Sequence, residues 1–355
     1  MTRHVFLRAA AAAAIALLAP STLAAQAVPP PAAPALSEAA LIARLTITID
    51  SLAGRDEFSG VVLLARAGTP VFQKAVGFAD REARRPNTVE TAFNLGSINK
   101  VFTATAIRQL AAQGKLSLDS TVGKYWPDYP NADVARQVTI RQLLEHRGGL
   151  GGNIFGAPPG GTRRDLKSLR DFLPLFVAEP LQFAPGTQQA YSNAGYLLLG
   201  LLVERLSGET YYDYVRNHIY NPAGLNHTAH FRSDSLPAYA ALGYTREGGS
   251  VARNTDLLPG IGSSAGGGYA TPQDLARFVQ ALREQRVPGG PPTGLGAAGG
   301  APGVNAVLEG DLPGGYDLVV MANLDPPAAE RVSRMVRGWL GVKDDGRVIR
   351  RPGGQ

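Results

Sequence analysis

A serine and a lysine three residues apart could supply a nucleophile and its activating base. They stand in Ser97-Ile98-Asn99-Lys100, at the start of a stretch with helical spacing of apolar residues, so both side chains lie on one helix face. A serine hydroxyl is a weak nucleophile until a neighbouring base removes its proton, and a lysine can do so when desolvation lowers its pKa. The pattern is common by chance, so it predicts acyl-transfer chemistry only together with its context.

That context is a series of segments in a fixed order along the chain. They are residues 93–103 (FNLGSINKVFT), 139–150 (TIRQLLEHRGGL), 183–200 (FAPGTQQAYSNAGYLLLG), 220–228 (YNPAGLNHT) and 266–276 (GGGYATPQDLA). The series closely resembles the serine β-lactamase and D-alanyl-D-alanine carboxypeptidase family, in particular the branch of class C β-lactamases and related esterases. The resemblance spans roughly Gly60 to Leu340. It implies a serine hydrolase that forms an acyl-enzyme on Ser97, acts on ester or amide bonds and needs no cofactor.

The resemblance carries a second family motif, Tyr-x-Asn, onto Tyr191-Ser192-Asn193. A tyrosine beside Lys100 can have its phenol pKa lowered and can pass protons between nucleophile and leaving group. The Asn193 amide can donate to a substrate carbonyl and accept from Lys100. Asn193 could instead cap a helix, but beside Ser97 and Lys100 the catalytic interpretation is favoured.

The third family motif is usually Lys-Thr-Gly or His-x-Gly on a strand that lines the site. Here it falls on Ala297-Ala298-Gly299-Gly300, which has neither a basic nor a hydroxyl side chain. Gly299 and Gly300 are candidate substrate-binding residues, because the Gly300 N–H could join the Ser97 N–H in an oxyanion hole. The cation that would hold a β-lactam or peptide carboxylate is missing. This departure disfavours efficient β-lactamase activity more than ester or amide hydrolysis in general.

Other interpretations of the chain are weaker. Residues 262–266 (GSSAG) fit the nucleophile elbow of α/β-hydrolases, but that motif needs a preceding strand, and proline and glycine occur there instead. His227 and His230 match no metal-ligand spacing, so no metal site is expected. His146 follows a short predicted helix and is interpreted as structural. The alternative function is a binding protein that kept the fold, lost turnover and recognises cell-wall peptide or related ligands.

The elements that must position these residues predict an α+β fold. Apolar periodicity indicates helices at 37–52, 97–113, 193–206, 273–284 and 328–340, and β-rich runs at 60–66, 70–76, 304–308 and 316–321. Strands near both ends around a mainly helical middle predict one antiparallel sheet built from both termini and flanked by helices. A helical lobe completes the fold, and the site is expected between the sheet and this lobe.

The N-terminal segment predicts export. Arg3 and Arg8 precede a short apolar run and the A-x-A site Ala25-Gln26-Ala27, as in a secretory signal peptide. We therefore expect a signal peptide at 1–27, a flexible lead-in at 28–36, a catalytic domain at 37–340 and a polar tail at 341–355. The mature protein is expected in the periplasm or outside the cell.

Composition excludes several classes of protein. The 355 residues contain no cysteine, which rules out a disulfide framework and a cysteine nucleophile. The net charge is +6, but no basic run interleaves with aromatic residues, so nucleic-acid binding is not expected. The apolar run near the N-terminus is too short for stable membrane insertion. The expected partner is a small-molecule or peptide ester or amide, and the oligomeric state stays open.

Overall fold

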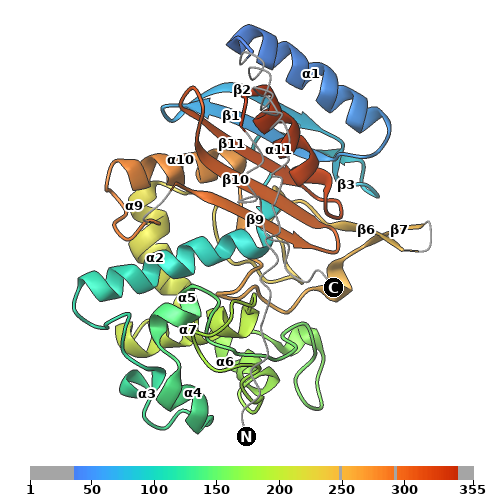
Figure 1. Cartoon of the computed structure of the whole chain (residues 1–355). Coiled ribbons are helices and arrows are strands. Elements are labelled where there is room, and N and C mark those ends of the chain that lie inside the picture. The colour runs from blue at the N-terminus through green and yellow to red at the C-terminus, as the bar shows by residue number, and fades with distance from the viewer. Residues whose placement is uncertain (1–35, 248–249, 292–293, 343–355) are drawn as a thin grey trace, which may run out of the picture. The chain divides into compact units, whose positions relative to one another are not determined.

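The computed structural model describes residues 36–247, 250–291 and 294–342, and their centre is a five-stranded antiparallel sheet (Figure 1). Its strand order is β2-β1-β11-β10-β9, with bounds Thr69–Val76, Gly60–Arg66, Tyr316–Ala322, Val304–Leu312 and Gly296–Ala301. Strands β1 and β11 pair with Gly60 opposite Ala322 and Leu63 opposite Val319. One antiparallel sheet built from both ends of the described chain is therefore confirmed.

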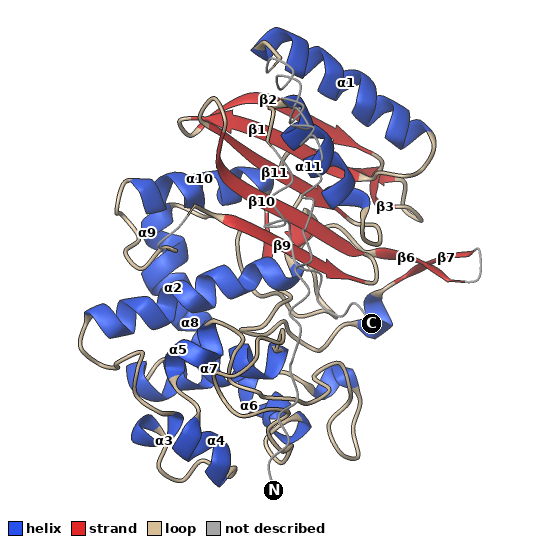
Figure 2. Ribbon diagram, in the orientation of Figure 1, coloured by secondary structure: helices blue, strands red, loops and turns tan. Residues whose placement is uncertain are grey.

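Helices cover both faces of this sheet, so its central strands are buried on both sides. Alternate residues of β1 enter different cores, with Val61 and Leu63 in one and Val62 and Leu64 in the other. On one face lie α1 (Glu38–Gly54) and α11 (Ala328–Trp339); on the other lies α10 (Pro272–Arg283) (Figure 2). These three helices match the predicted ones within two residues, because side-chain caps define two of their starts: Ser37 for α1 and Thr271 for α10.

The remaining elements form the predicted helical region and three short two-stranded sheets. The helices are α3 (Val122–Tyr125), α4 (Ala132–Gln137), α5 (Ile140–Leu144), α6 (Leu169–Phe172), α7 (Asn193–Ser207), α8 (Tyr211–Val215) and α9 (Asn221–Ala223). The short strands are β3 (Phe78–Asp80), β4 (Arg85–Pro86), β5 (Phe93–Asn94), β6 (Tyr244–Glu247), β7 (Ser250–Arg253) and β8 (Tyr269–Ala270). A fold of mixed helix and antiparallel sheet is therefore confirmed.

Helix α2 (Asn99–Ala112) connects the sheet to the helical region, as Figure 1 shows. It was predicted to begin at Ser97, but a 3-10 turn, Gly96–Ile98, precedes it. The apolar residues along one side of this helix predicted that only that side would be buried. In the structure the polar residues Thr103 and Asn99 are also fully buried. The reason is that α2 packs against α7 and α8 while the turn before it packs against β9 and β10.

The predicted terminal segments are mostly not covered. The signal peptide at 1–27, all but residue 36 of the lead-in at 28–36 and residues 343–355 of the polar tail lie outside the described residues, so these boundaries stay predictions. In the part of the chain that is described, no helix has the length and apolar character needed to span a membrane.

An ion pair with a fully buried carboxylate joins α10 to β11. The Asp317 carboxylate is completely buried and accepts from Arg283 Nη1 at 2.6 Å. We expect Arg283→Met to lower the free energy of unfolding by about 3 kcal/mol, because it leaves an uncompensated buried charge. Denaturant unfolding would measure this loss. Arg286→Met removes an exposed pair with Glu284 and should cost less than about 1 kcal/mol, so equal losses would contradict the assignment.

Candidate active site

The turn that carries Ser97 is set by the residues just before it. Gly96 has φ +48°, a left-handed conformation that favours glycine, and its N–H donates to Asn94 Oδ1 at 2.9 Å. Ser97 then lies at the point where β5 gives way to α2, and it is only half-buried. The turn therefore leaves the hydroxyl open to a pocket, while most of α2 is buried.

Lys100 lies one turn further along and is buried. Its Nζ is 3.2 Å from Ser97 Oγ and 2.8 Å from Asn193 Oδ1, and it also donates to the Ala265 carbonyl oxygen. Among the described residues no carboxylate pairs with it, and burial holds the pKa of Lys100 well below its usual range. The oxygen acceptors favour the ammonium form, but without an anion they do not offset the loss of hydration. The predicted nucleophile–lysine pair is therefore present, with the lysine pKa lowered by the expected cause.

Tyr191 contacts the same serine oxygen. Its hydroxyl donates to Ser97 Oγ at 2.6 Å. The expectation that Lys100 lowers the phenol pKa is wrong: burial is the largest influence, and it raises the pKa of Tyr191. A phenolate in this enclosed position would lose its hydration, so Tyr191 is a protonated donor.

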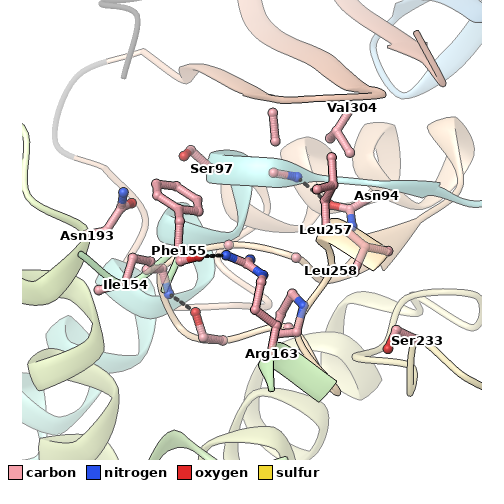
Figure 3. A pocket seen from close by; sticks show the side chains of 18 of the residues that line it. Asn94, Ser97, Ile154, Phe155, Arg163, Asn193, Ser233, Leu257, Leu258 and Val304 are labelled. Carbon is pink, nitrogen blue, oxygen red and sulfur yellow. Dashed lines mark hydrogen bonds between the residues drawn. The ribbon is translucent and has the colours of Figure 1, made fainter. Parts of the chain in front are cut away.

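Asn193 is the first residue of α7, but it is not the helix cap. Ser192 is the cap, since its hydroxyl accepts from Gly195 N at 3.0 Å. The Asn193 amide oxygen accepts from Lys100 instead. Its amide nitrogen has no acceptor among the described residues, and the side chain lines the pocket (Figure 3). The side chain is therefore free to donate to a bound carbonyl, as the sequence predicted.

His146 packs on the tyrosine of this group. Its ring stacks on Tyr191 with centroids 4.5 Å apart, and its Nδ1 accepts from the Ser192 N–H at 3.1 Å. Burial, followed by the charge of Lys100, lowers the pKa of His146 to about 4, so the ring is neutral at ordinary pH. The structural interpretation of His146 agrees with these contacts, and the partner it supports is Tyr191.

The serine-rich loop at 262–266 anchors α2. The side chains of Asn99, Thr103 and Lys100 donate to its successive carbonyl oxygens at residues 263–265, the first two at 2.9 and 2.7 Å. No strand directly precedes this loop in the described chain, and the Ser264 hydroxyl is buried on a carbonyl of α7. The loop is not a nucleophile elbow. Sequence reasoning missed the Ala265 carbonyl because a main-chain acceptor has no residue-type signal.

Strand β9 carries the altered third motif and lies directly against the Ser97 turn. A Cβ added at Gly299 would lie 1.9 Å from Leu95 O and 2.8 Å from Ser97 N, so only glycine fits. Gly300 follows it and lines the pocket. Ala297 and Ala298 pack toward the two cores on either side of the sheet. The strand is thus where the resemblance implied, without a charged side chain.

A pocket of about 440 Å³ opens beside these groups. Ser97, Asn193 and Gly300 are part of its wall, which Figure 3 shows in close-up. Most of the other lining side chains are apolar: Ile154, Phe155, Phe172, Phe231, Leu257, Leu258, Pro259 and Val304. Within the described chain no cluster of three potential metal ligands is found, and the arrangement needs none for acyl transfer.

Comparison with known proteins agrees with this geometry. The sequence model of the family described as Beta-lactamase matches residues 48–342. Esterase EstB of Burkholderia gladioli is 33% identical over 337 residues, which cover 84% of this chain and 84% of EstB. A crystal structure of a penicillin-binding protein from Bacillus halodurans has a TM-score of 0.72 at 32% identity, covering 81% of this chain and 99% of that one.

Some relatives are considerably longer than the matching region. PbpX of Bacillus subtilis (strain 168) is 33% identical over 227 residues, which cover 63% of this chain and 55% of PbpX. A second relative from the same organism, a penicillin-binding protein, is covered over 47% of its length. The chain therefore spans about half the length of these two relatives.

The close approach of β9 to Ser97 generates a prediction. Gly299→Ala should abolish covalent modification of Ser97 and destabilise the fold, because its Cβ would overlap Leu95 O. Gly296→Ala is the matched control in the same strand, since a Cβ there meets nothing within 4 Å. Fluorophosphonate labelling and thermal unfolding of both variants would test this. Full labelling of the Gly299 variant would contradict it.

Proposed function

Because this chain belongs to the β-lactamase family, we propose that it is a serine hydrolase that cleaves ester or amide bonds through an acyl-enzyme on Ser97. The observation that carries the proposal is the double contact on the Ser97 hydroxyl, from Lys100 Nζ at 3.2 Å and Tyr191 OH at 2.6 Å. A base and an acid thus converge on the nucleophilic oxygen at the wall of a pocket.

Acylation follows from this arrangement. Neutral Lys100 takes the Ser97 proton while Oγ bonds to the substrate carbonyl carbon, whose oxygen becomes negatively charged. The N–H groups of Ser97 and Gly300 are the proposed donors to this oxyanion, and the Asn193 amide helps to orient the acyl group. When the intermediate collapses, the bond to the leaving group breaks. Tyr191 gives its proton to the departing alcohol or amine, and the proton held by Lys100 replaces it.

Deacylation repeats the steps with water. A water molecule loses a proton to the Lys100–Tyr191 pair and attacks the acyl carbon, and the bond to Ser97 Oγ breaks as the proton returns to that oxygen. The products are a carboxylic acid and free Ser97. No cofactor enters this balance.

The pocket favours esters with an apolar acyl group as the substrate class. Its walls are mainly apolar, and strand β9 supplies no cation for a carboxylate next to the scissile bond. The esterase named among the relatives matches this chain over most of its length, which supports the same choice. We also propose export, on the sequence of residues 1–27 alone.

The first test is covalent modification of Ser97. We expect a serine-reactive fluorophosphonate to add one adduct to the parent protein and none to Ser97→Ala, as read by intact mass. Ser233→Ala should still be labelled, because Ser233 lines the same pocket but has no contact with Lys100. If neither the parent nor the Ser233 variant is labelled, the hydrolase proposal fails and a binding role replaces it.

The lowered pKa of Lys100 predicts the pH dependence of that reaction. The neutral amine is the active form and exists above its pKa, so the labelling rate should rise with pH and level off well below the usual lysine range. Lys100→Gln should react at least about a hundredfold more slowly and lose this ionisation. Lys124→Gln, on an exposed lysine, should behave like the parent. If Lys100→Gln showed the same dependence of labelling rate on pH as the parent, Lys100 would be excluded as the base.

A further inference from the structure

The apolar pocket contains one charged lining residue among those described, Arg163. It belongs to a short 3-10 turn, Arg163–Asp165, in the loop that leads from α5 to α6. In the view of Figure 3 its side chain extends toward Phe155, between Asn193 and Leu258. The mechanism proposed for Ser97 makes no use of this cation, so its presence in an apolar wall needs a separate explanation.

Arg163 has unused hydrogen-bond donors. Its Nη1 donates to the Phe155 carbonyl oxygen, and the guanidinium lies 5.9 Å from the centroid of the Phe155 ring. Its Nε is buried and has no acceptor in the described structure. An arginine carries five N–H donors, so most of its donor capacity is left for something else.

Arg163 also has no anionic partner within the described residues. Burial lowers the pKa of its guanidinium, and no carboxylate offsets that effect. The next residue is different: Arg164 is exposed and pairs with Asp256 at 2.5 Å. The part of the unpaired Arg163 cation that lines the pocket is therefore available to an anion that enters it.

The chemistry of that acceptor follows from the guanidinium. Its planar fork holds a carboxylate through two parallel N–H···O bonds, which a single-point acceptor cannot match. The surrounding walls, including Ile154, Phe172 and Leu258, suit an apolar chain between the carboxylate and the reacting carbonyl. The acyl part stays on Ser97 after the leaving group has gone, and the proposal below places this part in the pocket beside Ser97.

We propose that Arg163 binds a carboxylate at the far end of the acyl group, so that the preferred substrates are half-esters of apolar dicarboxylic acids. This inference rests on the proposed hydrolase function and names the substrate class of the same site. Strand β9 has lost the cation expected beside the scissile bond, and Arg163 supplies a cation elsewhere in the pocket. In this proposal the substrate carboxylate is bound by Arg163, at the end of the acyl group away from the reacting carbonyl, and not beside the scissile bond.

Paired substrates test the proposal. The measurement is kcat/KM for p-nitrophenyl esters of hexanoic, octanoic and decanoic acid and for the half-esters of the matching dicarboxylic acids. The parent should prefer at least one half-ester over its neutral match. In Arg163→Gln this preference should fall by about tenfold or more, the range of a hydrogen bond between charged groups.

Two further variants sharpen the result. Arg164→Gln should keep the preference within about twofold, because it removes only an exposed ion pair. Arg163→Lys keeps the charge without the fork and should restore part of the preference. A parent without any preference, or a preference that is equal in Arg163→Gln, would overturn the proposal.

A binding measurement separates this inference from the hydrolase proposal. Calorimetric titration of Ser97→Ala compares octanedioic acid monoanilide with octananilide, and neither needs turnover. The carboxylate should tighten binding, and the added Arg163→Gln change should remove that gain. If Ser97 is labelled by the fluorophosphonate but the carboxylate does not tighten binding through Arg163, only this inference is overturned. If Ser97 is not labelled but the carboxylate does tighten binding through Arg163, the hydrolase proposal is overturned and Arg163 remains a carboxylate-binding residue.

Discussion

The buried amine of Lys100 is the interaction around which the site is organised. Its oxygen partners come from three parts of the chain: the turn at Ser97, the start of α7 at Asn193 and the loop carbonyl of Ala265. A buried amine without such acceptors would be strongly destabilising. The helices and the loop therefore have to meet at this point for the fold to be satisfied. The same requirement delivers the serine, the amide and the base to one place.

The environment then separates the roles of the two proton-transfer groups. Burial lowers the pKa of Lys100 and raises that of Tyr191, because in each case it disfavours the charged form. The lysine becomes a base and the tyrosine stays an acid, both within reach of Ser97 Oγ. Opposite shifts from a single cause are a common way to assign acid and base in one site. Neutral His146 stacks on Tyr191 without adding charge.

Strand β9 packs closely against the nucleophile turn but supplies no cation for recognition. Gly299 lies so near Leu95 O that no side chain fits there, and the two residues before it are alanines. The edge strand can offer backbone N–H groups but no cation. Specificity has to come from the rest of the pocket, where Phe155 and other apolar side chains surround Arg163. Catalytic chemistry and substrate choice are thus carried by different segments of the chain.

Residue types and spacing determined the antiparallel sheet from both chain ends, the helices beside it and the grouping of Ser97, Lys100, Tyr191 and Asn193. The sheet and helices follow from local periodicity and capping residues, and the grouping of the four site residues follows from the family resemblance that the order of motifs carries. They did not determine the phenol pKa, which was predicted in the wrong direction, because burial is a property of the packed molecule. The Ala265 carbonyl and the unpaired state of Arg163 were likewise decided only by the tertiary structure. A main-chain acceptor and a missing partner depend on which distant segments come together, and no local pattern records that.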